Sequence, residues 1–168
     1  YRHVRGDEAE PLMEAARLDR SRLPALLMPD GSVLVRPTIR DVAQQCGLAV
    51  AAGRPFYDVV VVGGGPAGLG SAVYAASEGL RTLLVEREAI GGQAGRSNRI
   101  ENYLGFPNGV SGAELAQRAR DQAIRFDVEL LNAADVVEVI PTGDGRTVRF
   151  ADGAEVAAHA IVLATGVT

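Results

Sequence analysis

The stretch DVVVVGGGPAG, residues 58–68, decides the fold of this chain. Its four consecutive valines predict a strand that is buried on both faces, as strands of a parallel sheet are. The glycines that follow match the pattern G-x-G-x-x-G, with Gly63, Gly65 and Gly68 at its three positions. The first glycine allows a tight turn, the second lets the backbone approach a pyrophosphate, and the third lets the helix pack on the strand. We therefore predict a strand, a glycine turn and a helix start that bind the pyrophosphate of a dinucleotide.

The sequence after the turn completes this fingerprint. Pro66 and Ala67 open a predicted helix that ends near Gly79, because proline is well tolerated in the first turn of a helix. The next predicted strand, 81–86, ends in Glu86, about 20 residues after the first glycine. A carboxylate there accepts both hydroxyls of an adenosine ribose and repels a 2′-phosphate. The alternative is a glycine-rich turn that binds nothing, which the complete strand–helix–strand context disfavours. The fingerprint alone does not separate FAD from NAD.

The composition excludes several classes of function. The 168 residues carry a net charge of −4 with a sequence pI of about 5.2, which argues against a basic nucleic-acid-binding face. No apolar run approaches the roughly 20 residues of a membrane span. The first residues also lack the apolar core of a secretory signal. We therefore expect a cytoplasmic protein without nucleic-acid or membrane partners.

Side chains that could perform chemistry on their own are few. Cys46 is the single cysteine, so the chain contains no internal disulfide and no CxxC pair. It falls on the apolar side of a short predicted helix with Ile39, Val42 and Ala43, and we expect it to be buried. The two histidines have neither metal-ligand spacing nor an acidic or serine partner nearby in sequence. We predict no metal site and no catalytic residue within these residues.

The chain divides into two pieces. Residues 1–49 form the first piece, 50–56 form a linker of small residues with Gly and Pro, and 57–168 form the second piece. In the second piece Ser111 caps a predicted helix that ends near residue 126. Further strands are expected at 128–131, 136–140, 147–150 and 159–164. This order predicts an α/β fold in which a parallel sheet carries a small β-meander.

The first piece has weaker but recognisable signals. We expect a strand at residues 1–4 and a helix over 7–18. The turn signal PDGS at 29–32 separates two apolar runs, which should pair as a hairpin. Thr38 and Asp41 then form a capping box at the start of a second helix.

Further motifs follow the glycine turn in a fixed order. They are GGQA at 91–94, IENYLG at 100–105 and ATG at 164–166. Together with GGGPAG and Glu86, these motifs resemble the FAD domain of thioredoxin-reductase-like flavoproteins, which are FAD-dependent pyridine nucleotide-disulfide oxidoreductases. The resemblance covers residues 57–168 and implies a Rossmann-like FAD-binding domain.

The resemblance also implies roles for individual residues. Residues 63–68 would bind the pyrophosphate, and Glu86 would bind the adenosine ribose. The other implied cofactor contacts are Arg87, then Gly92, Gln93 and Asn102 along the ribityl chain and flavin, Val136 or Val137 at the adenine, and Thr165 and Gly166 over the cofactor. For Gln93 and Asn102, ordinary hydrogen bonding within a loop is the alternative. Arg96 and Arg99 either contact a phosphate or nicotinamide nucleotide, or lie in a solvated loop.

The implied activity is that of an FAD-dependent NAD(P)H oxidoreductase resembling thioredoxin-disulfide reductase. Hydride would pass from NAD(P)H to FAD and then to a disulfide or other acceptor, such as a thioredoxin-like partner. The resemblance further implies a homodimer and an NAD(P)H domain outside this chain, so that residues 1–168 alone would not be competent. Two alternatives stay open. One is the NAD-binding domain of another dehydrogenase, and the other is a non-enzymatic flavin-binding sensor or scaffold.

The first piece resembles the later part of a thioredoxin or glutaredoxin fold. In that comparison Leu23-Pro24 is the cis peptide bond before the third strand, although a trans bond is the usual state of an X–Pro pair. The whole order resembles bacterial fusions in which a response-regulator or thioredoxin-like module precedes a thioredoxin-disulfide reductase. We therefore expect a fragment that starts with a partial thioredoxin/glutaredoxin-like segment and is truncated before the NAD(P)H domain.

Overall fold

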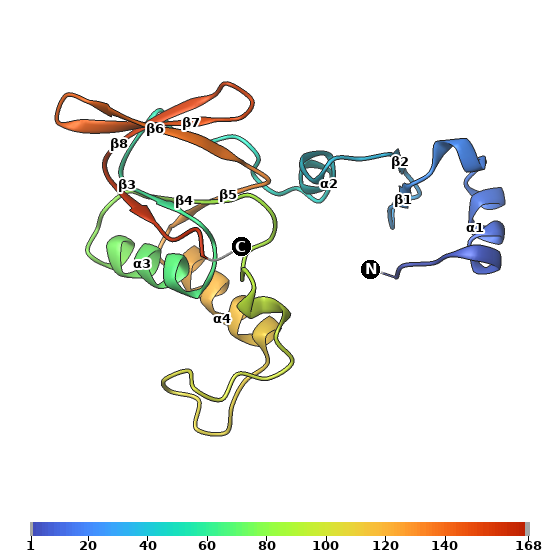
Figure 1. Ribbon diagram of the computed structural model, residues 1–168, viewed down its shortest axis with the longest axis horizontal. Helices are drawn as coiled ribbons and strands as arrows, with labels where there is room; N and C mark the ends of the chain where they lie inside the picture. Colours follow the sequence, from blue (N-terminus) through green and yellow to red (C-terminus); the bar gives the residue numbers. More distant parts are fainter. Residues whose placement is uncertain (1, 167–168) are drawn as a thin grey trace.

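The computed structural model describes residues 2–166 and is organised around a six-stranded sheet (Figure 1). The strand order is β5-β4-β3-β8-β7-β6. The strands are β3 (Phe56–Val62), β4 (Thr82–Glu86), β5 (Glu129–Asn132), β6 (Val136–Thr142), β7 (Gly145–Phe150) and β8 (Glu155–Leu163). Strands β5, β4, β3 and β8 run parallel, whereas β8, β7 and β6 pair antiparallel. The predicted parallel sheet with a small meander is confirmed.

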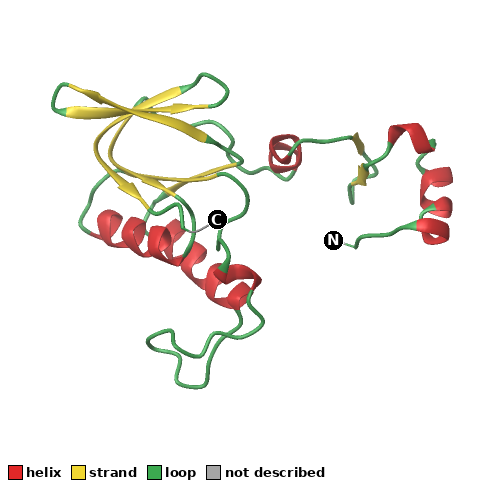
Figure 2. Ribbon diagram, viewed as in Figure 1, coloured by secondary structure: helices red, strands yellow, loops and turns green. Residues whose placement is uncertain are grey.

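Each face of the sheet has its own hydrophobic core. Helices α3 (Pro66–Ser77) and α4 (Gly112–Arg125) cover one face, and the meander lies on the other (Figure 2). Successive side chains of a strand point to opposite faces. Val59 and Val61 of β3 therefore pack toward the helices, whereas Val60 and Val62 pack into the other core. All four valines are buried, as the predicted two-sided strand requires.

Helix α4 begins at the predicted cap. The Ser111 side chain accepts a hydrogen bond from the backbone N–H of Glu114 at 3.1 Å. The Glu114 carboxylate pairs with Arg118 one turn along the helix, so the structure shows one half of the capping box. Leu115 and Ala123 are buried and fix the inner face of the helix. The stretch before α4 contains only a short 3-10 helix, η3 (Ala94–Arg96).

The first piece consists of short elements. They are η1 (Gly6–Glu8), α1 (Glu10–Ala15), η2 (Arg20–Arg22), β1 (Ala25–Leu27), β2 (Val33–Val35) and α2 (Ile39–Gln45). The predicted hairpin forms between β1 and β2, and the capping box between Thr38 and Asp41 is present. The Leu23-Pro24 peptide bond is cis, as the resemblance implied. Residues 2–4 form no strand, and the predicted first helix is divided into η1 and the shorter α1.

The prediction that Cys46 is buried was wrong, because its side chain is exposed. Within the predicted apolar face only Ala43 is buried, while Ile39 is 57% exposed. An apolar stripe is buried only when a second layer covers it. The elements of the first piece extend to one side of the sheet (Figure 1), and no such layer packs on this side of α2 among the described residues. No helix within residues 2–166 is long and apolar enough to cross a membrane.

Candidate cofactor-binding site

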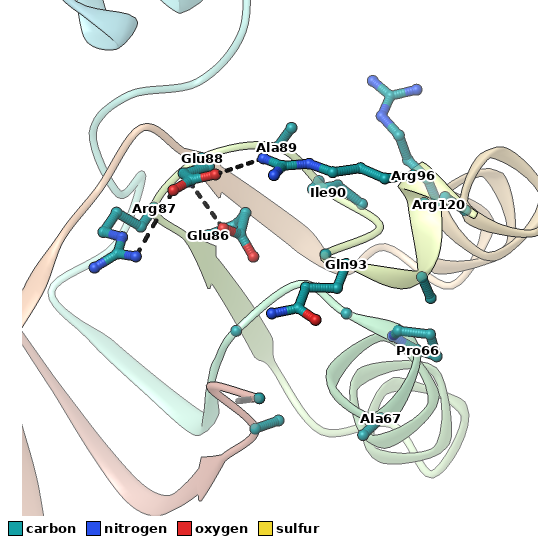
Figure 3. A pocket seen from close by; sticks show the side chains of 18 of the residues that line it. Pro66, Ala67, Glu86, Arg87, Glu88, Ala89, Ile90, Gln93, Arg96 and Arg120 are labelled. Atoms are coloured by element: carbon teal, nitrogen blue, oxygen red, sulfur yellow. Dashed lines mark hydrogen bonds and ion pairs between the residues drawn. The ribbon is translucent and has the colours of Figure 1, made fainter. Parts of the chain in front are cut away.

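A cavity of about 710 Å³ lies at the carboxyl ends of β3, β4 and β8 (Figure 3). Open α/β sheets bind ligands at this end of their strands. The volume falls within the range typical of small-molecule and cofactor sites. The sequence-predicted residues that line the cavity are Gly63, Gly65, Pro66, Ala67, Glu86, Arg87, Gly92, Gln93, Thr165 and Gly166. The structure therefore brings together residues from segments that are far apart in the sequence.

The three fingerprint glycines have different surroundings. A Cβ on Gly63 would overlap the backbone of Ala164, and Gly63 has a φ of +109°. A Cβ on Gly68 would overlap the carbonyl oxygen of Gly63, so this glycine lets α3 lie against the end of β3. A Cβ on Gly65 would meet nothing within 4 Å, because that position borders the open cavity. The first and third glycines thus serve packing, and the second leaves the cavity wall open.

The N-terminus of α3 points at the cavity. Gly65 is its N-cap and supplies no side-chain cap, and Pro66 occupies the first turn. The first N–H groups of a helix have no partner within the helix. Together with the positive end of the helix dipole, such groups stabilise a bound anion. This end of the cavity is therefore suited to a phosphate group.

Glu86 is held in place at the end of β4. Its Oε2 atom accepts a hydrogen bond from the backbone N–H of Gly64 at 2.7 Å, and its Oε1 atom accepts one from the N–H of Glu88 at 2.8 Å. A carboxylate has about four lone-pair positions, so both oxygens can accept further hydrogen bonds. The backbone of the glycine turn and of Glu88 thus orients the carboxylate.

Charged side chains surround the rim of the cavity. Glu88 accepts a hydrogen bond from Arg96 of η3 at 2.9 Å, and Arg87 lies 3.7 Å from the other oxygen of the same carboxylate. Arg120 of α4 also lines the cavity (Figure 3). Arg99 instead pairs with Glu101 and bonds the carbonyl oxygen of Asn108, outside the cavity lining. Of the two loop arginines weighed from the sequence, only Arg96 lies where it can meet a ligand in this cavity.

Besides Gly68, which packs against Gly63, three expected contacts do not line this cavity. Asn102 lies in the exposed loop between Ile100 and Val110, which pair with each other as an isolated bridge. Val137 on β6 is 58% exposed, and Val136 packs against the core beneath the meander. The proposed contacts of Asn102 with the flavin and of the valines with the adenine stay predictions.

The sequence did not indicate two residues that organise the site. Gly64 and Glu88 act on Glu86 through their backbone N–H groups, which nearly every residue type possesses. Gly64 occupies an unrestricted position of the fingerprint, yet a Cβ there would stand 3.1 Å from the Cβ and Oε2 atoms of Glu86. Only knowledge that Glu86 folds back onto the turn would have revealed this requirement.

The most extensively bonded ion pair of the sheet lies at its opposite end. Arg81 donates to both oxygens of Asp58 at 2.9 Å, and its backbone N–H donates to Oδ2 at 2.8 Å. These hydrogen bonds lower the pKa of Asp58 to about 2. The pair joins β3 to the start of β4 and leaves the cavity end of both strands to the glycine turn and Glu86.

Comparison with known proteins identifies the family of residues 57–168. The family model described as pyridine nucleotide-disulphide oxidoreductase matches residues 57–168. A bifunctional thioredoxin reductase/thioredoxin of Mycobacterium leprae is 40% identical over 116 residues, which cover 69% of this chain and 25% of that protein. A thioredoxin reductase of Mycolicibacterium smegmatis is 38% identical over 113 residues, which cover 67% of this chain and 36% of that protein.

A solved structure gives the same result for the fold. The thioredoxin reductase of Streptococcus pyogenes matches with a TM-score of 0.64 and 35% identity over 68% of this chain and 36% of that one. The Rossmann-like FAD-binding fold expected from the sequence is therefore confirmed. The match spans only between 25% and 36% of the length of these relatives. By its family match and its relatives, the chain belongs to the pyridine nucleotide-disulphide oxidoreductases.

Proposed function

We propose that residues 57–168 form the FAD-binding portion of an NAD(P)H-dependent oxidoreductase that resembles thioredoxin-disulfide reductase. One observation carries this proposal. The Glu86 carboxylate, held by the Gly64 N–H, stands beside the N-terminus of α3 on the wall of a large open cavity. A ribose acceptor next to a phosphate-binding helix start is what an adenosine diphosphate moiety requires.

The residues of the cavity fit such a cofactor. Glu86 would accept the ribose hydroxyls, and the N–H groups at the start of α3 would bind the pyrophosphate. The open position in front of Gly65 is the space a pyrophosphate needs, since no atom stands within 4 Å of a Cβ built there. Gly92 and Gln93 line the same cavity and are the proposed contacts of the flavin portion.

The bound flavin would accept a hydride from NAD(P)H and pass electrons to an acceptor. The contribution of this chain is to bind and orient the cofactor. Cys46 is its single cysteine, so a reactive dithiol would have to come from outside residues 1–168. A disulfide is the proposed acceptor, and a thioredoxin-like protein is the proposed partner. Support comes from the relatives, which include a bifunctional thioredoxin reductase/thioredoxin.

We also propose that residues 1–49 are part of a thioredoxin/glutaredoxin-like module and that the intact protein is a homodimer. The order of hairpin and helix α2 supports the first proposal. The second rests on the family resemblance alone, and sedimentation of the intact protein by analytical ultracentrifugation would test it.

Cofactor content tests the main proposal. The intact protein should purify yellow and release FAD on denaturation, and the stripped protein should regain its yellow colour when FAD is added. The Gly65→Val variant should lose flavin, because its side chain enters the space of the pyrophosphate. It should keep its unfolding temperature, because that space contains no protein atom within 4 Å of the Cβ. Colourless protein that binds NAD would contradict the proposal.

A further inference from the structure

The segment that joins the two pieces of the chain lies on the sheet and is bonded to it. We call residues 49–55 the connecting segment. At its start, the N–H of Asn132 on β5 donates to the carbonyl oxygen of Ala49 at 2.9 Å. At its end, the N–H of Ala157 on β8 donates to the carbonyl oxygen of Pro55 at 2.9 Å. The connecting segment therefore bridges two strands of the sheet.

A pair of polar side chains holds the middle of the connecting segment. Glu129 of β5 accepts the backbone N–H of Gly53 on one carboxylate oxygen and the Tyr57 hydroxyl, at 2.8 Å, on the other. The same hydroxyl accepts the backbone N–H of Arg54 at 3.1 Å. Tyr57 is 1% exposed and belongs to the core under the meander. The network thus anchors a surface segment to a residue of the core.

The protonation of Tyr57 is consistent with this role. Burial and the neighbouring Glu129 raise the pKa of Tyr57 to about 12. The hydroxyl is therefore a donor throughout the physiological pH range. Apolar contact adds to the polar anchor, because Ala52 packs against the same core.

No free stretch of chain separates α2 from the connecting segment. The N–H groups of Gly47 and Leu48 fold back and donate to the carbonyl oxygens of Gln44 and Ala43. The next residue, Ala49, is already bonded to β5. A flexible tether needs residues that are bonded neither to α2 nor to the sheet. Leu48 is bonded to α2 and Ala49 is bonded to β5, so this junction contains no such residue.

A second contact joins the two pieces at another point. Arg40 of α2 forms an ion pair with Asp152, in the turn between β7 and β8, at 2.9 Å. Both side chains are about 39% exposed, so the pair is a modest contact by itself. It nevertheless restrains α2 against rotation about its bonded end.

We propose that the connecting segment is a structural part of the cofactor domain and fixes helix α2 against it in one orientation. Modules in one chain usually move relative to each other unless their interface is extensive. Here the restraint comes from the bonded connection and the Arg40–Asp152 pair. Helix α2 therefore keeps a fixed position beside the sheet and is not the end of a flexible tether. This inference does not depend on the identity of the cofactor.

The exposed Cys46 provides a native labelling position at the end of α2. In the Asp144→Cys variant of the intact protein, with any cysteines outside these residues replaced, spin labels on both thiols report the distance between α2 and the exposed turn that joins β6 and β7. We expect one narrow distance distribution. Glu129→Ala should broaden it, and hydrogen exchange at the Gly53 amide should become about tenfold faster, because that N–H loses a charged acceptor.

Matched variants make the outcome decisive. Glu129→Gln keeps an acceptor oxygen and should retain most of the narrow distribution, whereas Glu114→Gln, on the distant helix α4, should change nothing. Arg40→Gln lies on the surface and should broaden the distribution without lowering the unfolding temperature. A parent distribution as broad as that of Glu129→Ala, or a Glu129→Ala distribution as narrow as the parent's, would overturn the proposal.

Discussion

The cofactor domain (residues 57–168) and the N-terminal module (residues 1–49) use the same local signals with different results. Both contain side-chain helix caps, turn glycines and apolar runs. In the cofactor domain these signals coincide with burial, and Leu83 and Leu84 of β4 are fully buried. In the N-terminal module Leu12, Leu27 and Ile39 are between 42% and 57% exposed. Local sequence therefore forms the elements in both regions, but only the sheet supplies long-range partners.

The difference follows from topology. Strands β3, β4 and β8 bring together residues that are separated by up to about a hundred positions, and each buries the others. The hairpin of β1 and β2 pairs only with itself, and an isolated two-stranded hairpin is marginally stable. Stability should accordingly concentrate in the cofactor domain, and the variants below test this asymmetry.

The largest effect is expected at Gly68. A Cβ at this position would overlap the carbonyl oxygen of Gly63. Gly68→Ala therefore forces two backbone segments apart. We expect a loss of unfolding free energy above about 4 kcal/mol, the scale of severe overpacking. Gly70→Ala in the same helix is the matched control, because its Cβ would meet nothing within 4 Å. It should stabilise α3 by about 0.5–1 kcal/mol. Equal effects in urea unfolding would contradict the packing assigned to the glycine turn.

A leucine pair tests the asymmetry between the two regions directly. Leu84→Ala removes a fully buried side chain and should cost about 3 kcal/mol through lost burial and a cavity. Leu27→Ala removes a 42% exposed side chain of β1 and should change the unfolding free energy by less than about 0.5 kcal/mol. Chemical unfolding of both variants measures the contrast. A large cost at Leu27 would mean that a further part of the protein covers the hairpin.

The sequence predicted most of the cofactor domain because its signals were local and redundant. A run of valines, a glycine turn and an acid after the next strand together specify one arrangement, and the structure has it. The prediction that Cys46 is buried failed for the opposite reason. Helical periodicity indicates which side of α2 is apolar, but it does not indicate whether another layer covers that side. Gly64 and Glu88 were missed because they act through backbone groups, whose partners depend on the tertiary fold.

Cofactor affinity should separate Glu86 from its neighbour Glu88. Glu86→Ala removes the proposed acceptor of the ribose hydroxyls and should weaken FAD binding by about 2 kcal/mol, the scale of hydrogen bonds to a charged group. Glu88→Gln is the control, because Glu88 orients the carboxylate through its backbone N–H, which the variant keeps. Its FAD affinity should stay within about 0.5 kcal/mol, as expected for an exposed ion pair. Isothermal titration of the stripped protein compares them, and equal losses would move the ribose contact elsewhere.

The last prediction concerns the boundary between the two regions, where the stability should depend on pH only at high pH. The pKa of Tyr57 is raised from 10.0 to about 12, first by burial and then by Glu129, so the folded state favours the protonated hydroxyl. A group whose folded pKa lies above its unfolded pKa contributes stability that is complete below the unfolded value. That contribution should therefore be full below pH 10 and fall as the pH rises toward 12. Urea unfolding at about pH 8 and about pH 11 should show a larger decline for the parent than for Tyr57→Phe, which has no ionisable hydroxyl. Parallel declines would mean that folding does not raise the pKa of Tyr57, and this would contradict its burial beside Glu129 at the boundary.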